Sequence, residues 1–177
     1  MTLQELTRAV RAGTIDTVIV AFPDPFGRLV GKRCRAAYFL DSVVAHGTHG
    51  CNYLLTVNID MDPLDGFKVA SWDTGFGDFG FRPDMATLRV LPWQTATALV
   101  ICDFVRDDGS LVSEAPRSVL QGQMDRLKRR GWTCFCASEL EFYLFNQTYS
   151  SAHAARSEEH TSELQSLAYL VCRLLLE

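Results

Sequence analysis

Two glutamates alternate along an otherwise apolar segment, residues 137–145. If this segment is a strand, Glu139 and Glu141 share one face, because side chains at positions i and i+2 of a strand point the same way. A strand this hydrophobic is expected to be buried, and a buried carboxylate is costly unless it is paired or bound to a metal. The spacing favours a site for a hard divalent cation, Mg²⁺ or Mn²⁺, at Glu139 and Glu141. A half-exposed edge strand with two solvated acids is the other interpretation.

A helix and a strand must position these two glutamates. Ser113 is a candidate helix cap, Pro116 suits the first helical turn, and Gly131 ends the pattern. We expect one apolar face of this helix to point inward, and its members are Val119, Leu120, Met124 and Leu127. Residues 132–137 are expected to form a strand just before the glutamates.

The residues before this helix predict a small mixed sheet with few helices, an α+β arrangement. Helices are expected over 3–10 and 38–46, with Phe39, Val43 and Val44 of the second pointing inward. Strands are expected over 17–22, 28–35, 52–58, 87–91 and 97–105. A long irregular stretch, 60–84, separates the third strand from the fourth, and Asp24 is interpreted as a turn acid.

Gly75 to Gly80 fits the Gly-x-Gly-x-x-Gly pattern of dinucleotide-binding proteins. That site requires a helix directly after the glycines, and Pro83 opposes one. We therefore expect these glycines to serve a sharply turning loop, and no cofactor-binding residue is predicted in the chain.

Composition excludes several classes of function. The chain is 47% hydrophobic and 21% charged, so it can bury a core. Its net charge of −4 and its lack of a basic block argue against nucleic acid and anionic membranes as partners. It has no apolar run of membrane-spanning length and no signal-peptide pattern, which predicts a cytoplasmic protein. The cysteines before residue 156 are expected to be reduced and mostly buried: Cys34, Cys51, Cys102, Cys134 and Cys136.

The last segment, residues 156–177, looks foreign to the rest of the chain. Arg156 to Ser166 reads as the in-frame translation of one half of a common sequencing adapter. Leu170 to Glu177 reads as the translation of the other half, and the three residues between fit the variable index. We interpret 156–177 as a non-native tail and exclude it from the fold. An amphipathic helix with leucines at helical spacing is the alternative.

Three motifs, in this order, resemble the glutamine synthetase family over about residues 3–150. The first, Asp24-Pro-Phe-Gly-Arg28 with Gly31-Lys32, resembles the hairpin of that family's N-terminal β-grasp domain. The second is Phe81-Arg-Pro-Asp-Met-Ala-Thr87 followed by Leu91-Pro-Trp93. The third runs from Ser113 through the helix to Ser138-Glu-Leu-Glu-Phe-Tyr-Leu-Phe145 and resembles the opening of the catalytic domain. The resemblance implies a β-grasp domain over 1–108 and a truncated start of a catalytic domain over 109–155.

The resemblance also implies a function. Members of this family are ATP-dependent ligases that phosphorylate the γ-carboxylate of glutamate, after which ammonia or an amine displaces the phosphate. Mg²⁺ or Mn²⁺ ions hold the nucleotide phosphates and neutralise the charge that develops on transfer. Glu139 and Glu141 match the family's first two metal-ligating glutamates, the same pair that the strand pattern selects. A homo-oligomeric ring is expected for the full-length protein.

A departure from the family pattern lies in the loop that meets the incoming amine. The family usually has Asp-Gly-Ser-Ser there, whereas this chain has Asp73-Thr-Gly-Phe-Gly77 after Trp72. Asp73 is the best match for the amine-contacting aspartate, and the departure leans toward a larger amine, as in a γ-glutamyl-polyamine synthetase. Because the family's other site residues lie farther downstream, the fragment is expected to be inactive alone. A free-standing β-grasp module for protein contacts, without catalysis, is the competing hypothesis.

Overall fold

The computed structural model describes residues 1–73, 75–137, 148, 150–151 and 154. It divides into two compact units, residues 1–129 and 130–177. All the helices and strands named below belong to the first unit. The predicted boundary between domains over 1–108 and 109–155 stays a prediction.

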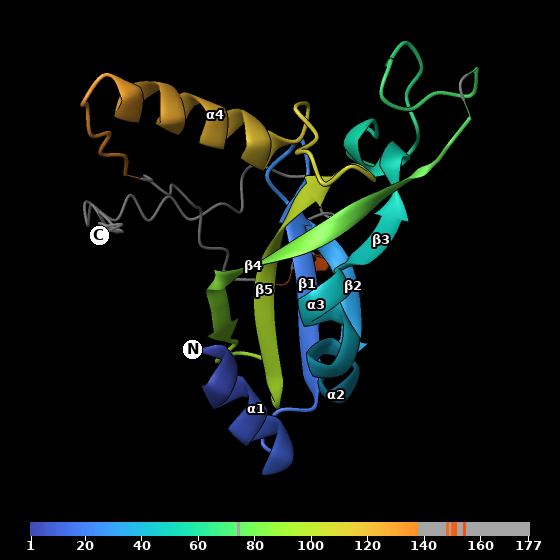
Figure 1. Cartoon of the computed structure of the whole chain (residues 1–177). Helices are drawn as coiled ribbons and strands as arrows, with labels where there is room; N and C mark the ends of the chain where they lie inside the picture. The colour runs from blue at the N-terminus through green and yellow to red at the C-terminus, as the bar shows by residue number, and fades with distance from the viewer. Residues whose placement is uncertain (74, 138–147, 149, 152–153, 155–177) are drawn as a thin grey trace. The chain divides into compact units, whose positions relative to one another are not determined.

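A five-stranded sheet forms the centre of the first unit (Figure 1). Its strands are β1 (Thr17–Pro23), β2 (Leu29–Arg35), β3 (Thr48–Cys51), β4 (Asp78–Val90) and β5 (Thr97–Val105). They lie in the order β2-β1-β5-β4-β3, with β1 and β5 parallel at the centre and the other pairs antiparallel. This mixture of helices and strands confirms the predicted α+β class; the β-grasp assignment stays a prediction.

The helices match their predicted positions closely. α1 (Leu3–Arg11) begins at a capping box, in which Thr2 and Glu5 satisfy each other's backbone N–H groups. Residues 36–46 form one helical run: α2 (Ala36–Tyr38), a π-helical turn (Phe39–Val43) and α3 (Val44–His46). Phe39 and Val43 are fully buried, as their spacing predicts. α4 (Pro116–Arg129) is the last helix of the unit.

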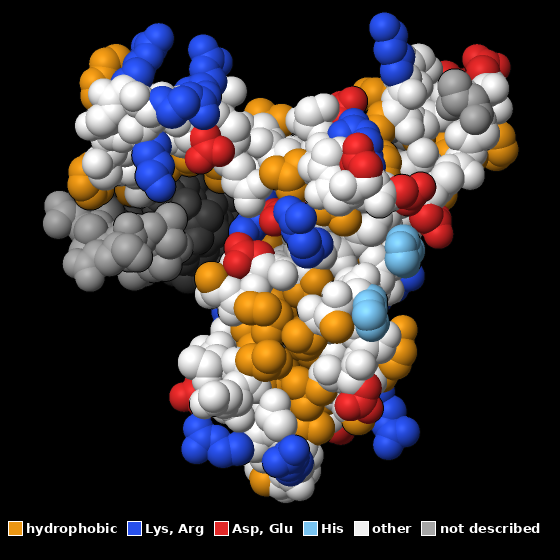
Figure 2. All heavy atoms as spheres, viewed as in Figure 1, with side chains coloured by type: hydrophobic (Ala, Val, Ile, Leu, Met, Phe, Trp, Pro, Cys, Tyr) orange, Lys and Arg blue, Asp and Glu red, His pale blue; other side chains and the backbone are white. Residues whose placement is uncertain are grey.

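The core lies between the sheet and the helices α1 to α3. Alternate residues of β1 and β5 point into it, among them Val18, Val20, Val100 and Cys102. Burial raises the pKa of the Cys102 thiol to about 12, so it packs as a neutral apolar side chain. Figure 2 shows hydrophobic side chains gathered at the surface between α1 and α3, where this core borders solvent.

Four phenylalanines from three strands form the middle of this core. Phe104 of β5 packs against Phe22, Phe79 and Phe81, with ring centroids 4.4, 5.7 and 5.0 Å away and edge-to-face geometry in each pair. Such pairs contribute more than their buried area alone. Phe104 thereby joins β1, β4 and β5 from the inside of the sheet.

Two predictions in the middle of the chain are wrong. The strand expected over 52–58 is instead a 3₁₀ helix, Asn52–Leu55, and the strand of this region is β3, just before it. β3 can form because Gly47 takes a positive φ and because Gly50 leaves room for the Phe81 ring, 2.2 Å from where a Cβ would stand.

The irregular stretch expected over 60–84 ends earlier than predicted, because β4 already begins at Asp78. Pro83 lies within β4 opposite Cys102, just before the register shift that follows Asp84. The strand β4 thus begins within the glycine pattern of 75–80, and the helix that a dinucleotide-binding motif requires does not follow Gly80.

In the third motif the structure differs from the prediction at two further points. None of the α4 residues is buried, so the apolar face expected to point inward is exposed at Val119, Leu120 and Met124. Residues 132–137, expected to form a strand, are irregular. A strand is stable only when its backbone groups find a hydrogen-bonded neighbour.

Candidate functional site

The two glutamates predicted to bind a metal lie outside the described residues, so Glu139 and Glu141 stay a prediction. Among the residues that the structure describes, no group of three or more His, Cys, Asp or Glu side chains could hold a metal ion.

Asp73 lies at the tip of a narrow loop. An isolated bridge between Ser71 and Gly75 closes the loop two residues on either side of Asp73. Asp73 is exposed, and Trp72 beside it is 71% exposed. The fold thus presents a carboxylate and an indole to the outside on adjacent residues, an arrangement that can meet a ligand from solvent.

Side chains from the 3₁₀ helix hold the base of this loop. The Asn52 amide donates to the Val69 carbonyl (3.0 Å) and accepts from the backbone N–H of Gly77 (3.2 Å). The Phe76 ring meets Tyr53 on one side and Trp72 on the other, with centroids 6.1 and 5.0 Å away. These contacts fix the position of Trp72 relative to the core, and therefore also the position of Asp73.

A second anchor fixes the start of the same irregular region. Asp24 is fully buried in the β1–β2 hairpin, where it accepts hydrogen bonds from the backbone of Phe26 and Arg28 and from the Arg28 Nε (2.7 Å). The Arg28 guanidinium also donates hydrogen bonds to the carbonyl of Ile59 and to the sulfur of Met61. The turn-acid interpretation of Asp24 is confirmed, and Arg28 emerges as the link that sequence reasoning missed. An aspartate followed four residues later by arginine around a Pro-x-Gly turn is the signal that could have shown it.

The Asp24 carboxylate predicts a pH-dependent stability. Burial opposes its ionisation, but hydrogen bonds from Arg28 and Phe26 outweigh burial and hold its pKa below the usual value of 3.8. A lowered pKa in the folded state means that this stabilisation is complete above the unfolded pKa and disappears as pH falls through the folded one. We expect Asp24→Asn to lower the free energy of unfolding at pH 7 by about 2 kcal/mol. In urea titrations the difference from wild type should shrink below about pH 4.

The matched control is Asp65→Asn, which removes an exposed carboxylate from the same irregular region. It should change the free energy of unfolding little at either pH. A difference for Asp24→Asn that is the same at pH 7 and pH 3 would contradict the role given to the ionised carboxylate.

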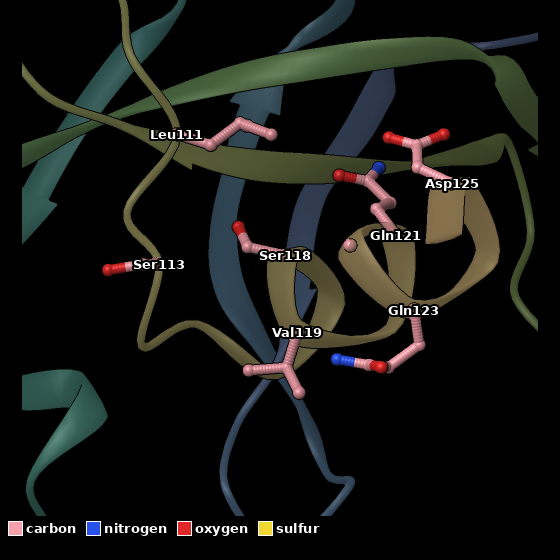
Figure 3. A pocket seen from close by; sticks show the side chains of 8 residues that line it. Leu111, Ser113, Ser118, Val119, Gln121, Gln123 and Asp125 are labelled. Carbon is pink, nitrogen blue, oxygen red and sulfur yellow. The ribbon is translucent and has the colours of Figure 1, made fainter. Parts of the chain in front are cut away.

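A shallow depression of about 580 Å³ lies beside the first half of α4 (Figure 3). Its lining mixes polar and apolar residues: Ser113, Ser118, Gln121, Gln123 and Asp125 with Leu111, Val119 and Gly122. The Ser118 hydroxyl is buried without a hydrogen-bond partner among the described residues. The depression holds no nucleophile–base pair and no cluster of acids, so it does not compete with the Asp73 loop as a candidate site.

Comparisons with known proteins agree with the three motifs. Residues 113–170 match the model of the glutamine synthetase catalytic domain, a range that begins at the predicted helix cap and runs into the 156–177 segment. Gamma-glutamylethanolamide synthetase GlnA4 of Streptomyces coelicolor is 52% identical over 150 residues, which are 85% of this chain and 32% of that protein. A glutamate–isopropylamine ligase of a Pseudomonas species is 34% identical over 140 residues, 79% of this chain and 30% of the ligase.

Solved structures support the fold. A glutamine synthase homologue superimposes with a TM-score of 0.56 at 20% identity, covering 66% of this chain and 27% of the homologue. The complex of GmaS with ADP gives a TM-score of 0.53 at 22% identity and covers 71% and 25%. In the part of the chain that the structure describes, no helix is long and apolar enough to cross a bilayer. The chain belongs to the glutamine synthetase family and spans about a third of the length of the curated relatives it matches.

Proposed function

We propose that the chain is part of an ATP-dependent ligase that joins the γ-carboxylate of glutamate to an amine through a γ-glutamyl phosphate. The observation that carries this proposal is the 52% identity to gamma-glutamylethanolamide synthetase over 150 residues, together with the Glu-x-Glu pattern at Glu139 and Glu141. Ammonia is the smallest acceptor such a ligase could use. The names of the two curated relatives favour a larger primary amine.

Each predicted site residue has a role in this proposal. Glu139 and Glu141 would hold Mg²⁺ or Mn²⁺, which supplies charge neutralisation during phosphoryl transfer. Asp73 would accept a hydrogen bond from the ammonium form of the amine and hold its nitrogen near the acyl phosphate. The exposed Trp72 beside it offers an apolar surface to the carbon chain of an alkylamine, a contact that ammonia cannot use.

The proposal also includes the location and the assembly of the full-length protein. A cytoplasmic, homo-oligomeric ligase would have ATP available and could complete its site with loops of a neighbouring subunit. By itself the present chain would bind Mg²⁺ only at millimolar concentration, because two carboxylates satisfy a minority of the six oxygen ligands that the ion takes. Isothermal titration of the chain with Mg²⁺ and ATP checks this; micromolar ATP binding would contradict it.

A chimera tests the ligase function directly. Residues 1–150 of this chain replace the matched segment of the Streptomyces relative, and ATP-dependent phosphate release is measured with glutamate and ammonia, ethanolamine, isopropylamine or putrescine. We expect release with at least one of the three organic amines, at a higher kcat/KM than with ammonia. A folded chimera without amine-dependent release would overturn the proposal. Sequencing the gene past the codon for Ala155 separates the ligase from the interaction module, since only the ligase needs further site residues there.

Within the chimera, Asp73→Asn is expected to raise the amine KM at least about tenfold, because the amide oxygen lacks the charge that strengthens a hydrogen bond from an ammonium group. The glutamate KM should stay unchanged, because Asp73 is assigned to the amine alone. Initial rates at varied amine and at varied glutamate separate the two constants. Asp78→Asn, an exposed carboxylate at the start of β4, is the matched control. An unchanged amine KM in Asp73→Asn would remove Asp73 from the site.

A further inference from the structure

Hydrophobic burial does not hold α4 on the sheet. Its 14 residues include none that is buried, and Val119, Leu120 and Met124 are between 41% and 62% exposed. Figure 1 shows that the N-terminal end of α4 is the end that meets the sheet. Val112 and Ala115, just before the helix, are buried in the core, so the chain enters α4 from a fixed point. Among the described residues, the side-chain contacts that can set the direction of the helix from that point are polar.

The polar contacts come from the first half of α4 and converge on two aspartates. The Arg117 Nε donates to Asp103 Oδ1 (2.7 Å), and its Nη2 forms an ion pair with Asp84 Oδ2. One turn later, the Gln121 amide donates to the same Asp103 oxygen (3.2 Å). We call these four residues the clasp: Arg117 and Gln121 on the helix, Asp84 and Asp103 on the sheet.

The sheet holds both aspartates in place. Asp84 of β4 lies opposite Ile101, and Asp103 of β5 lies opposite Arg82, so the two carboxylates leave the same face as diagonal neighbours. The register shift of β4 follows Asp84, and the Thr87 hydroxyl locks it by donating to the Asp84 carbonyl (2.7 Å) and accepting from the Ile101 N–H (2.8 Å). The bulge therefore fixes where the Asp84 carboxylate points.

The chemistry of the clasp requires arginine. One guanidinium faces two carboxylates in different directions, and its planar fork can donate to both at once. A lysine ammonium has the charge but is a single point at the end of a flexible stem. The side chains of Arg117 and Asp103 are only 24% and 12% exposed, so solvent screens this pair less than an ordinary surface pair. The second arginine, Arg82, lies 4.0 Å from Asp103 and balances the charge of the two aspartates.

We propose that Arg117 is a positioning residue, which sets the angle of α4 on the sheet and through α4 the start of the catalytic segment. α4 lies within the range that matches the catalytic domain, whereas both aspartates precede that range. The clasp thus ties the catalytic segment to the sheet that carries the Asp73 loop. Its importance for ligation rests on the proposed function; its hold on α4 does not.

Hydrogen exchange of the 177-residue chain, followed by mass spectrometry, tests whether the clasp holds α4 on the sheet. Arg117→Gln is expected to speed exchange of peptides from 116–129 at least about tenfold, with peptides from 97–105 unchanged within twofold. Arg117→Lys should behave like Arg117→Gln, because charge without the fork does not restore the clasp. Arg126→Gln is the matched control: it removes the same charge from the same helix, where Arg126 contacts Gln123 within α4.

Three results would overturn the proposal. Unchanged exchange of α4 in Arg117→Gln would show that the clasp does not hold the helix. Full wild-type protection in Arg117→Lys would show that the fork is not required. Equal acceleration in 97–105 would reduce Arg117 to a general stabiliser. Asp84→Asn and Asp103→Asn give a second measure should Arg117→Gln fail to fold: Asp103→Asn should have the larger effect, since Asp103 serves both Arg117 and Gln121.

The chimera separates this inference from the ligase proposal. There Arg117→Gln is expected to lower kcat about tenfold with the amine KM unchanged, because misplacing the catalytic segment affects the reaction geometry and leaves the Asp73 loop intact. If the unmodified chimera is inactive, the ligase proposal fails while the exchange result still judges the clasp. If exchange follows the expectation and kcat does not change, the positioning role in ligation is wrong.

Discussion

Replacing Glu139 with glutamine in the chimera is expected to lower kcat by about three orders of magnitude, because the cation proposed at this position would supply several kcal/mol of charge stabilisation during phosphoryl transfer. Glutamine keeps the size and the hydrogen-bonding oxygen of the side chain but loses the charge that Mg²⁺ prefers. The same change at Glu141 should act similarly, since alternation in the predicted strand would place both carboxylates on one face.

The metal dependence of the rate separates a ligand from a structural residue. For Glu139→Gln, the Mg²⁺ concentration that gives half-maximal phosphate release should rise, and Mn²⁺ should restore part of the lost rate. Glu114→Gln is the control, because Glu114 is an exposed acid that pairs with Arg106 at 3.2 Å outside the predicted site. If Glu139→Gln keeps the wild-type rate and metal dependence, two solvated acids on an edge strand become the better interpretation.

Sequence patterns predicted those elements whose apolar or turn residues form a clear local pattern. The β-branched run from Thr17 gives β1, and the apolar run from Thr97 gives β5, because both are interior strands of the sheet that pack against the core. The hairpin between β1 and β2 follows from local turn chemistry at Pro25 and Gly27. In each case the deciding interactions are near in sequence or repeat with the strand period.

The errors arise where a distant residue decides the structure. Tyr53, Leu54 and Leu55 have the composition of a strand, yet the strand of this region is β3, where Gly50 makes room for the Phe81 ring of β4. On α4, leucine and methionine spacing predicts an inward face, but the described contacts of the helix with the sheet are polar. Periodicity shows that a helix has an apolar face and does not show which neighbour covers it.

In the candidate site and the clasp too, contacts between residues close in sequence could be predicted, and contacts between distant residues could not. Asp24 could be interpreted from its own turn, since its partners are Phe26 and Arg28. The Arg117–Asp84 pair joins residues 33 positions apart, and only the register of β4 against β5 places Asp84 beside Asp103. Only its resemblance to the family singles out the Pro-Asp motif at Pro83 and Asp84 in the sequence. In the structure, Asp84 of this motif pairs with Arg117 and so anchors α4 on the sheet.

The second large effect is expected in the core. Phe104→Ala should lower the free energy of unfolding by about 4 kcal/mol, because the substitution removes a ring that is 2% exposed and leaves a cavity among Phe22, Phe79 and Phe81. That is a large part of the total stability of a domain of this size, roughly 5–15 kcal/mol. Urea unfolding followed by far-ultraviolet circular dichroism measures it.

Two further variants show whether packing is the cause. Phe135→Ala removes the same side chain from a position that is 83% exposed, and it should leave the unfolding midpoint unchanged. Phe104→Leu keeps much of the volume but loses the edge-to-face contacts, so its loss should fall between the other two. If Phe104→Ala costs no more than Phe135→Ala, these four rings do not hold β1, β4 and β5 together. The sheet that carries the Asp73 loop and the two aspartates of the clasp would then need another source of stability.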